Sequence, residues 1–170
     1  MIQNKVSKKR WVRFAVEDIK LKYDMHFIDG KRYYEFDMRT DLPLLEETAP
    51  YMFQYKNITI YSTSWKKMTL KILSAIDTLK PKTDDELLSI HYHWTKTQVF
   101  SRTKRTNYTP FRNLYLNTNH SSTHAMMNIQ GLLKEYDIPL GECYFLIRRH
   151  FVAEPKEVRN IIREKQLDSL

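Results

Sequence analysis

The chain has 170 residues, of which 42% are hydrophobic, and its formal net charge is +8 at pH 7. This length and composition allow a core to be buried without disulfide bonds, which argues against wholesale disorder and favours one domain, or one domain with a small annex. No apolar run reaches the length of a membrane span, and the first residues lack the apolar core of a secretory signal. Cys143 is the single cysteine, so no internal disulfide can form. We therefore expect a cytoplasmic protein with no membrane partner.

Glycine is scarce, with three residues that are far apart in the chain: Gly30, Gly131 and Gly141. A loop that cradles phosphates needs several glycines close together, because the backbone must approach the phosphates. The sequence therefore argues against P-loop and dinucleotide-binding folds, and we expect no cofactor.

The N-terminal part of the chain predicts a basic arm followed by β-structure. Residues 1–10 are polar and basic, which is typical of a frayed tail or of an arm that contacts nucleic acid. Aromatic-rich alternating runs predict strands near 11–17, 22–28 and 32–38. Asp29-Gly30 separates the last two runs and predicts a hairpin turn, since both residue types tolerate positive φ.

Residues 40–50 are acidic and contain two prolines, so this segment predicts a connection. We place the domain boundary here. Residues 1–48 would form a basic arm and β-hairpin annex, and residues 49–170 an α+β domain.

The second unit alternates helical and strand patterns. A strand at 58–61 precedes a helix from Trp65 to Leu79, which follows a possible cap at 62–64 and stops before Pro81. A second helix is expected from Thr83 through about Trp94, and residues 95–113 predict a loop with short strand pieces.

The remaining elements complete an α+β fold class. A short strand is expected at 114–116, a third helix after a cap at 121–123, a strand at 144–149 and a final helix after Pro155. The expected architecture is an N-terminal antiparallel β-hairpin unit followed by a helical C-terminal domain with a small β element.

The positive charge is concentrated in one stretch of the chain. No Asp or Glu occurs between Lys96 and Lys134. A solvated face usually mixes both signs of charge, whereas an acid-free segment keeps a positive potential that attracts phosphates. Double-stranded DNA is therefore the favoured partner, and a merely basic soluble domain is the alternative.

Two segments of this stretch carry the candidate contacts. Asn117, Thr118 and Asn119 precede a helix start, where asparagine amides could pair with adenine and the helix amides, with Ser121 and Ser122, could hold a phosphate. The same residue types are also ordinary turn and capping residues. The second segment is basic and rich in hydroxyl groups, and its candidate phosphate-contacting residues are Arg102, Thr103, Lys104, Arg105 and, further on, Arg112. A solvated surface loop is the alternative reading of this segment.

The run Leu-Tyr-Leu-Asn-Thr-Asn at 114–119, the helical Met-Met-Asn-Ile at 126–129 and Ile-Pro at 138–139 together resemble the C-terminal DNA-binding domain of SeqA-type replication modulators. The resemblance implies that Asn117 and Asn119 read bases at a short palindromic adenine-methylation site and that the Arg102–Arg105 segment grips phosphates. Histidines and hydroxyls at 120–124 stand where the family has basic residues, and an aromatic hairpin replaces its oligomerising helices. We therefore expect a domain of similar shape with another DNA role.

Two other functions stay open. A protein-interaction module, such as an accessory or inhibitory factor of mobile-element or defence biology, would show an exposed aromatic surface around Tyr33, Tyr34 and Tyr55. A metal-dependent nuclease would use Glu35 and Asp37, which share one strand face, or Glu17-Asp18.

Three further features favour structural roles. The histidines at 91, 93, 120 and 124 are expected at the surface and not on a metal, because no HExxH motif is present and soft ligands are few. Cys143 is expected to be an inert core thiol. The leading hypothesis is a DNA-binding protein without catalytic activity.

Overall fold

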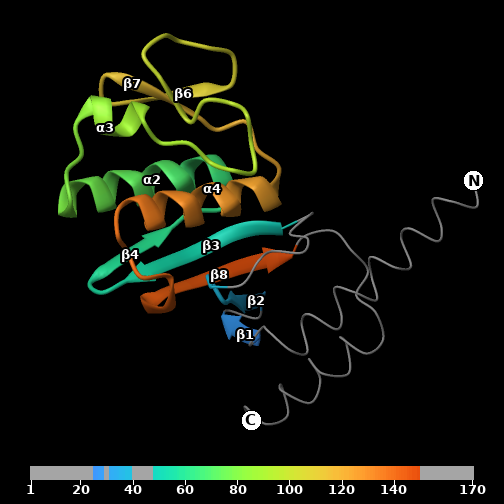
Figure 1. Cartoon of the computed structure of the whole chain (residues 1–170). Coiled ribbons are helices and arrows are strands. Elements are labelled where there is room, and N and C mark those ends of the chain that lie inside the picture. The colour runs from blue at the N-terminus through green and yellow to red at the C-terminus, as the bar shows by residue number, and fades with distance from the viewer. Residues whose placement is uncertain (1–24, 29–30, 40–47, 150–170) are drawn as a thin grey trace, which may run out of the picture.

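The computed structural model of the chain describes residues 25–28, 31–39 and 48–149 (Figure 1). The strand expected near 11–17, the basic arm at 1–10 and the helix expected after Pro155 lie outside these ranges.

Five antiparallel strands form one sheet in the order β1-β2-β8-β3-β4. Their bounds are Met25–Ile28 for β1, Lys31–Phe36 for β2, Thr48–Tyr55 for β3, Ile58–Tyr61 for β4 and Cys143–Arg149 for β8. β1 and β2 pair antiparallel, with Ile28 opposite Lys31, which confirms the predicted pairing of these two runs.

The hairpin is continuous with the rest of this sheet. β2 pairs with β8, and β8 in turn pairs with β3, so the late strand lies between the two early segments. The residues expected as an annex thus add two strands to the main sheet. The boundary expected between residues 48 and 49 falls within β3.

β3 corrects the expectation of a connection as far as residue 50. Pro50 obscured the strand, because proline cannot donate to a ladder and is found in sheets mainly at edges and bulges. Pro50 pairs with Ile147, and the register shifts between Pro50 and Met52. β4 pairs only with residues 52–55 of β3, so Pro50 lies beyond the part of β3 that has a strand on both sides.

Two helices pack on one face of the sheet (Figure 1). α2 spans Trp65–Leu79 and α4 spans Ser122–Glu135, and both confirm predicted helices. Ser64 caps α2 by accepting the N–H of Lys67, and each helix buries a stripe of apolar side chains. α2 and α4 also contact each other.

α3 spans only Asp84–Leu88 and ends earlier than the predicted Trp94. The Ser89 N–H donates to the carbonyls of Asp85 and Glu86, and the Ser89 hydroxyl donates to the Glu86 carbonyl at 2.7 Å. These bonds close the last turn. The chain then turns so that Tyr92 is buried against α4, a long-range contact that local periodicity cannot reveal.

A second sheet of three short strands has the order β5-β7-β6. Its strands are β5 (Phe100–Ser101), β6 (Tyr108–Phe111) and β7 (Leu114–Asn117), which confirm the strand pieces expected in the 95–113 loop and the strand near 114. Figure 1 shows this sheet on the opposite side of α2 and α4 from the main sheet, with a 3-10 turn (Leu140–Glu142) leading into β8. The fold is therefore α+β, with the helix pair between two sheets.

One hydrophobic cluster runs through all three layers. Phe53 and Phe145 contribute from the main sheet, Ile72 from α2, and Phe100 and Leu116 from the small sheet, and all five are fully buried. The small sheet therefore shares a core with the helices and holds its loops at a fixed place on the molecule.

Gly131→Ala tests this packing. An added Cβ would lie 2.5 Å from Cε1 of Tyr92. Alanine favours an isolated helix by about 1 kcal/mol over glycine, yet overpacking costs about 1–3 kcal/mol, so we expect a net loss of stability in chemical denaturation. Ser74→Ala on the exposed face of α2 is the control and should change little. A stabilised Gly131→Ala variant would contradict the packing of Tyr92 on α4.

Candidate nucleic-acid interface

The two candidate segments meet in the structure. We call residues 102–107 the basic loop and residues 117–121 the Asn loop. The Asn107 carbonyl accepts hydrogen bonds from the Thr118 N–H at 3.2 Å and from the Thr118 hydroxyl at 3.1 Å. Thr118 Oγ1 also lies 2.7 Å from Thr109 Oγ1. Thr118 therefore joins the two loops, and its hydroxyl is engaged in hydrogen bonds within the chain.

Local hydrogen bonds shape the basic loop. The buried Ser101 hydroxyl donates to the Thr103 carbonyl at 2.9 Å and accepts the Thr103 N–H at 3.2 Å. At the other end, the Tyr108 N–H donates to the Arg105 carbonyl at 3.1 Å, and Asn107 adopts a φ of 68°. Asparagine tolerates this left-handed conformation better than most residues.

The cations of the basic loop differ in whether they form an ion pair within the chain. Lys104 and Arg105 are exposed, and the Arg105 guanidinium lies 5.7 Å from the centroid of the Tyr108 ring. Tyr108 is held in turn by a 2.6 Å hydrogen bond from its hydroxyl to the Gln98 carbonyl. Arg102 instead pairs with Asp85 at 2.6 Å, with both side chains largely in solvent, at 61% and 88% exposure.

Asn117 and Asn119 have different surroundings. Asn117 is only 7% exposed, its N–H donates to the Val99 carbonyl at 2.9 Å, and its Oδ1 accepts the Asn119 N–H at 3.1 Å. Asn117 thus shapes a turn, and its burial leaves little of the residue exposed for a base contact, which favours Asn119 as the candidate reader. Asn119 is exposed.

The two serines of the helix start are also engaged within the chain. Ser121 is the N-cap of α4 and accepts the His124 N–H at 3.4 Å. The Ser122 hydroxyl donates to the Thr48 carbonyl at 3.2 Å, so it links α4 to β3. Ser121 is confirmed as a cap, and the phosphate contacts expected of the two serines stay a prediction.

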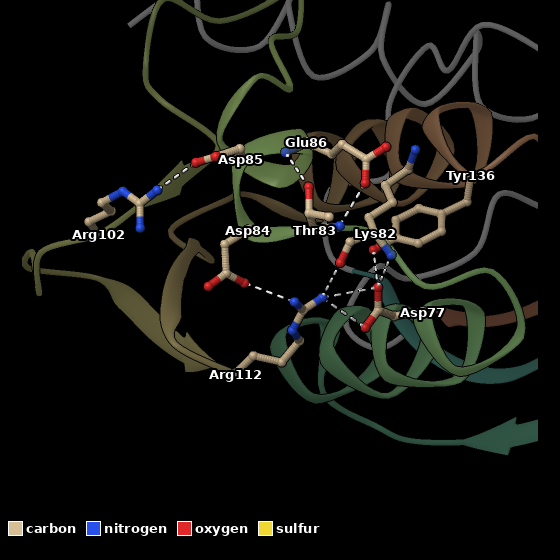
Figure 2. A network of polar contacts seen from close by, with 9 residues as sticks. All are labelled: Asp77, Lys82, Thr83, Asp84, Asp85, Glu86, Arg102, Arg112 and Tyr136. Carbon is tan, nitrogen blue, oxygen red and sulfur yellow. Dashed lines mark hydrogen bonds and ion pairs between the residues drawn. The ribbon is translucent and has the colours of Figure 1, made fainter.

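Arg112 lies in a network of internal contacts (Figure 2). Its Nη1 contacts Asp77 Oδ2 at 3.2 Å and the Lys82 carbonyl at 2.7 Å, and its Nη2 contacts Asp84 Oδ1 at 2.8 Å. Two carboxylates therefore offset the charge of one guanidinium, which weakens the case for Arg112 as a phosphate contact. Arg112 links the small sheet to α2 and α3, and this linkage accompanies a left-handed φ of 54° in the β6–β7 turn.

Further hydrogen bonds in Figure 2 involve the end of α4 and the start of α3. The Tyr136 hydroxyl donates to Asp77 Oδ1 at 2.8 Å, and burial together with the Asp77 carboxylate raises the pKa of Tyr136. Thr83 and Glu86 cap each other's backbone at the start of α3, and the Thr83 N–H lowers the pKa of Glu86. Tyr136 thus stays a hydrogen-bond donor across the ordinary pH range.

An aromatic cluster stands beside the Asn loop and was missed in the sequence. Trp94 stacks on His124 with ring centroids 5.3 Å apart, lies 5.5 Å from His120 edge-on, and stacks on Tyr92 at 5.7 Å. Burial, with the nearby His124, lowers the pKa of His120. The histidine spacing was visible in the sequence, but its partner Trp94 comes from another loop.

The carboxylates suggested for a nuclease do not form a metal-binding group in the described part of the chain, where no three His, Cys, Asp or Glu side chains converge. Asp37 is instead bound by Arg39 through contacts of 3.0 and 2.8 Å, which lower the pKa of Asp37. Glu17-Asp18 lies outside the described residues.

The aromatic hairpin surface suggested for a protein partner is not exposed. Tyr33, Tyr34 and Tyr55 are all buried, which corrects this expectation. Cys143 is half-buried and donates to the Pro139 carbonyl at 3.5 Å, and burial raises the pKa of its thiol to about 11. A thiol with a raised pKa is a poor nucleophile at neutral pH, in line with an inert residue.

Comparisons with known proteins give no relative: no family model, no curated protein and no solved structure matches the chain. No helix within the described ranges is long and apolar enough to cross a membrane.

Arg112→Ala should lower the free energy of unfolding by about 1–3 kcal/mol, since it leaves the partly buried Asp77 and Asp84 without their cation. Arg102→Ala is the matched control, because an exposed ion pair contributes about 0–1 kcal/mol. Urea denaturation of both variants measures the difference. Equal losses for the two would contradict a structural role specific to Arg112.

Proposed function

We propose that the chain binds DNA, without catalysing a reaction on it, through the basic loop and the Asn loop. The observation that carries the proposal is the pair of hydrogen bonds from Thr118 to the Asn107 carbonyl. These bonds join the basic loop, which carries the exposed Lys104 and Arg105, to the Asn loop, which carries the exposed Asn119. A surface with cations and a neutral amide offers both phosphate contacts and base contacts.

Lys104 and Arg105 are the residues proposed to contact phosphates. Arg105 rests on the Tyr108 ring, and Tyr108 is fixed by its bond to Gln98, so less side-chain freedom is lost when a phosphate is bound. Arg102 is a weaker contributor because Asp85 offsets its charge.

Two helix N-termini add to the positive potential near the Asn loop. Trp65 Nε1 and the Ser122 hydroxyl both donate to the Thr48 carbonyl, at 2.9 and 3.2 Å, so α2 and α4 begin at the same end of the molecule. Lys80 at the end of α2 donates to the Asp137 carbonyl after α4, so the helices also end together. Parallel helices place both positive dipole ends on the side of the Asn loop.

Asn119 is the residue proposed to read a base. Its backbone N–H is held by Asn117 Oδ1, which sets the shape of the loop before any ligand arrives. An asparagine amide can pair with N6 and N7 of adenine in the major groove. The resemblance to SeqA-type domains supports an adenine-containing duplex as the target, with Asn119 as reader and Asn117 as its support.

The double variant Lys104→Ala/Arg105→Ala should bind duplex DNA more weakly and with a smaller salt dependence. If each side chain contacts one phosphate, the slope of log K against log salt should fall by about 1.8. Titration by fluorescence anisotropy at several salt concentrations measures both quantities.

Lys80→Ala/Lys134→Ala is the control for this variant. It removes the same charge from exposed sites at the far ends of α2 and α4, about 20 Å from the Asn loop along α4. Equal effects of the two double variants would mean that net charge alone drives binding, and the proposed interface would be withdrawn.

Asn119→Ala should reduce the preference for the best duplex by about 1–3 kcal/mol and leave binding to a random duplex unchanged, because a lost base contact affects only the matching site. Competition among methylated, unmethylated and scrambled adenine-site duplexes measures this preference. Asn113→Ala, at an exposed site in the β6–β7 turn, is the control. A uniform loss of affinity on every duplex would assign Asn119 to the phosphates.

A further inference from the structure

β4 lies at the edge of the main sheet, and the hydrogen bonds around it show which of its N–H and C=O groups point away from β3. In the part of the chain that the structure describes, it pairs with β3 on one side and ends the strand order of the main sheet (Figure 1). The Ser62 N–H donates to the Tyr51 carbonyl at 3.1 Å, toward β3, whereas the Tyr61 carbonyl accepts Lys71 Nζ at 3.0 Å, away from β3. Alternate residues of an antiparallel strand point the same way, so the N–H and C=O of Thr59 and the N–H of Tyr61 face outward.

An open groove of about 600 Å³ runs along this edge, between β4 and α2. Its lining residues come from both elements: Thr59, Ile60, Tyr61, Leu70, Lys71, Ser74, Ala75 and Thr78. A strand added to a sheet lies about 4.8 Å from its neighbour, so an extended segment laid in this groove would reach the outward groups of β4.

Exposed apolar side chains mark the same place. Within the described residues, Tyr61 and Leu79 are the large hydrophobic residues that are exposed, at 55% and 50%. Leu79 lies one helical turn beyond the lining residue Ala75, on the side of α2. Tyr61 alternates with Ile58 and Ile60, which pack on the core, so its ring points to the opposite face of the sheet, where it lies edge-on to Tyr51. An added strand at this edge would therefore meet an exposed apolar side chain on each of its two faces.

The charge of the groove is one-sided. Lys71 is its charged lining residue, and the exposed Lys67 lies one turn earlier on the same face of α2. Lys71 also donates to the Tyr61 carbonyl, and a lysine at a sheet edge disfavours nonspecific pairing with other strands. A carboxylate on an incoming segment would draw Nζ away and free this carbonyl to accept a peptide N–H.

We propose that β4 and α2 bind an extended acidic segment of a partner protein, which pairs with β4 as a further strand of the main sheet. Its alternate apolar side chains contact Tyr61 on the face of the sheet away from α2, and the carboxylates between them lie on the face of α2, where one pairs with Lys71. A second copy of this chain would bring two sets of lysines together, which disfavours β4–β4 pairing. The groove is lined by none of the residues of the proposed DNA interface.

Selection of a displayed library of random eight-residue peptides against the full chain tests this proposal. The expected result is enrichment of sequences that alternate apolar residues with Asp or Glu. Synthetic peptides from this set should lose about tenfold in affinity for Thr59→Pro, which deletes one outward N–H, and keep their affinity for Thr59→Ala. Lys71→Glu, an exposed substitution that leaves the β3–β4 pairing intact, should reverse the charge preference of the selection.

Three results would overturn the proposal: no enrichment, enriched peptides that bind Lys71→Glu as well as the original chain, or a dimer in sedimentation that Thr59→Pro dissociates. Thermal denaturation of each variant establishes that it is folded. If Thr59→Pro does not fold, the Lys71→Glu selection decides alone.

Discussion

The carbonyl of Thr48 is the point on which the arrangement of the layers depends. It accepts hydrogen bonds from the indole of Trp65 and the hydroxyl of Ser122, the first residues of α2 and α4. The Trp65 ring also stacks on Phe145 of β8, with centroids 6.0 Å apart. These contacts fix both helices at one end of the main sheet. The Asn loop leads directly into α4, so its position on the molecule follows from this constraint.

The small sheet occupies the other side of the helix pair, and Arg112 ties it to α2 and α3 through Asp77 and Asp84. Residues that looked equivalent by charge therefore divide into two groups. Arg112 and, to a lesser extent, Arg102 form ion pairs within the chain, while Lys104 and Arg105 are exposed. The small sheet that carries the basic loop is thus joined to α2 and α3 by an arginine outside that loop.

Much of the fold could be predicted from the sequence, because the signals were local. Alternating aromatics, the Asp-Gly turn, serine caps and the apolar stripes of α2 and α4 each act over a few residues. β3 and the end of α3 could not, because Pro50 lies at a shift in the pairing register and Tyr92 packs on Gly131 from a distant part of the chain. The candidate site was limited in the same way. Spacing does not distinguish the buried Asn117 from the exposed Asn119, and the two carboxylates that pair with Arg112 lie 28 and 35 residues away.

Hydrogen–deuterium exchange of the full chain with and without duplex DNA tests the central claim most directly, because it locates the contact without altering a residue. If the basic loop and the Asn loop form one interface, DNA should slow exchange together at residues 102–107 and 117–121, and leave β4 and the C-terminal turn of α2 unchanged. Slowed exchange confined to other segments, or none under conditions where DNA is bound, would contradict the account.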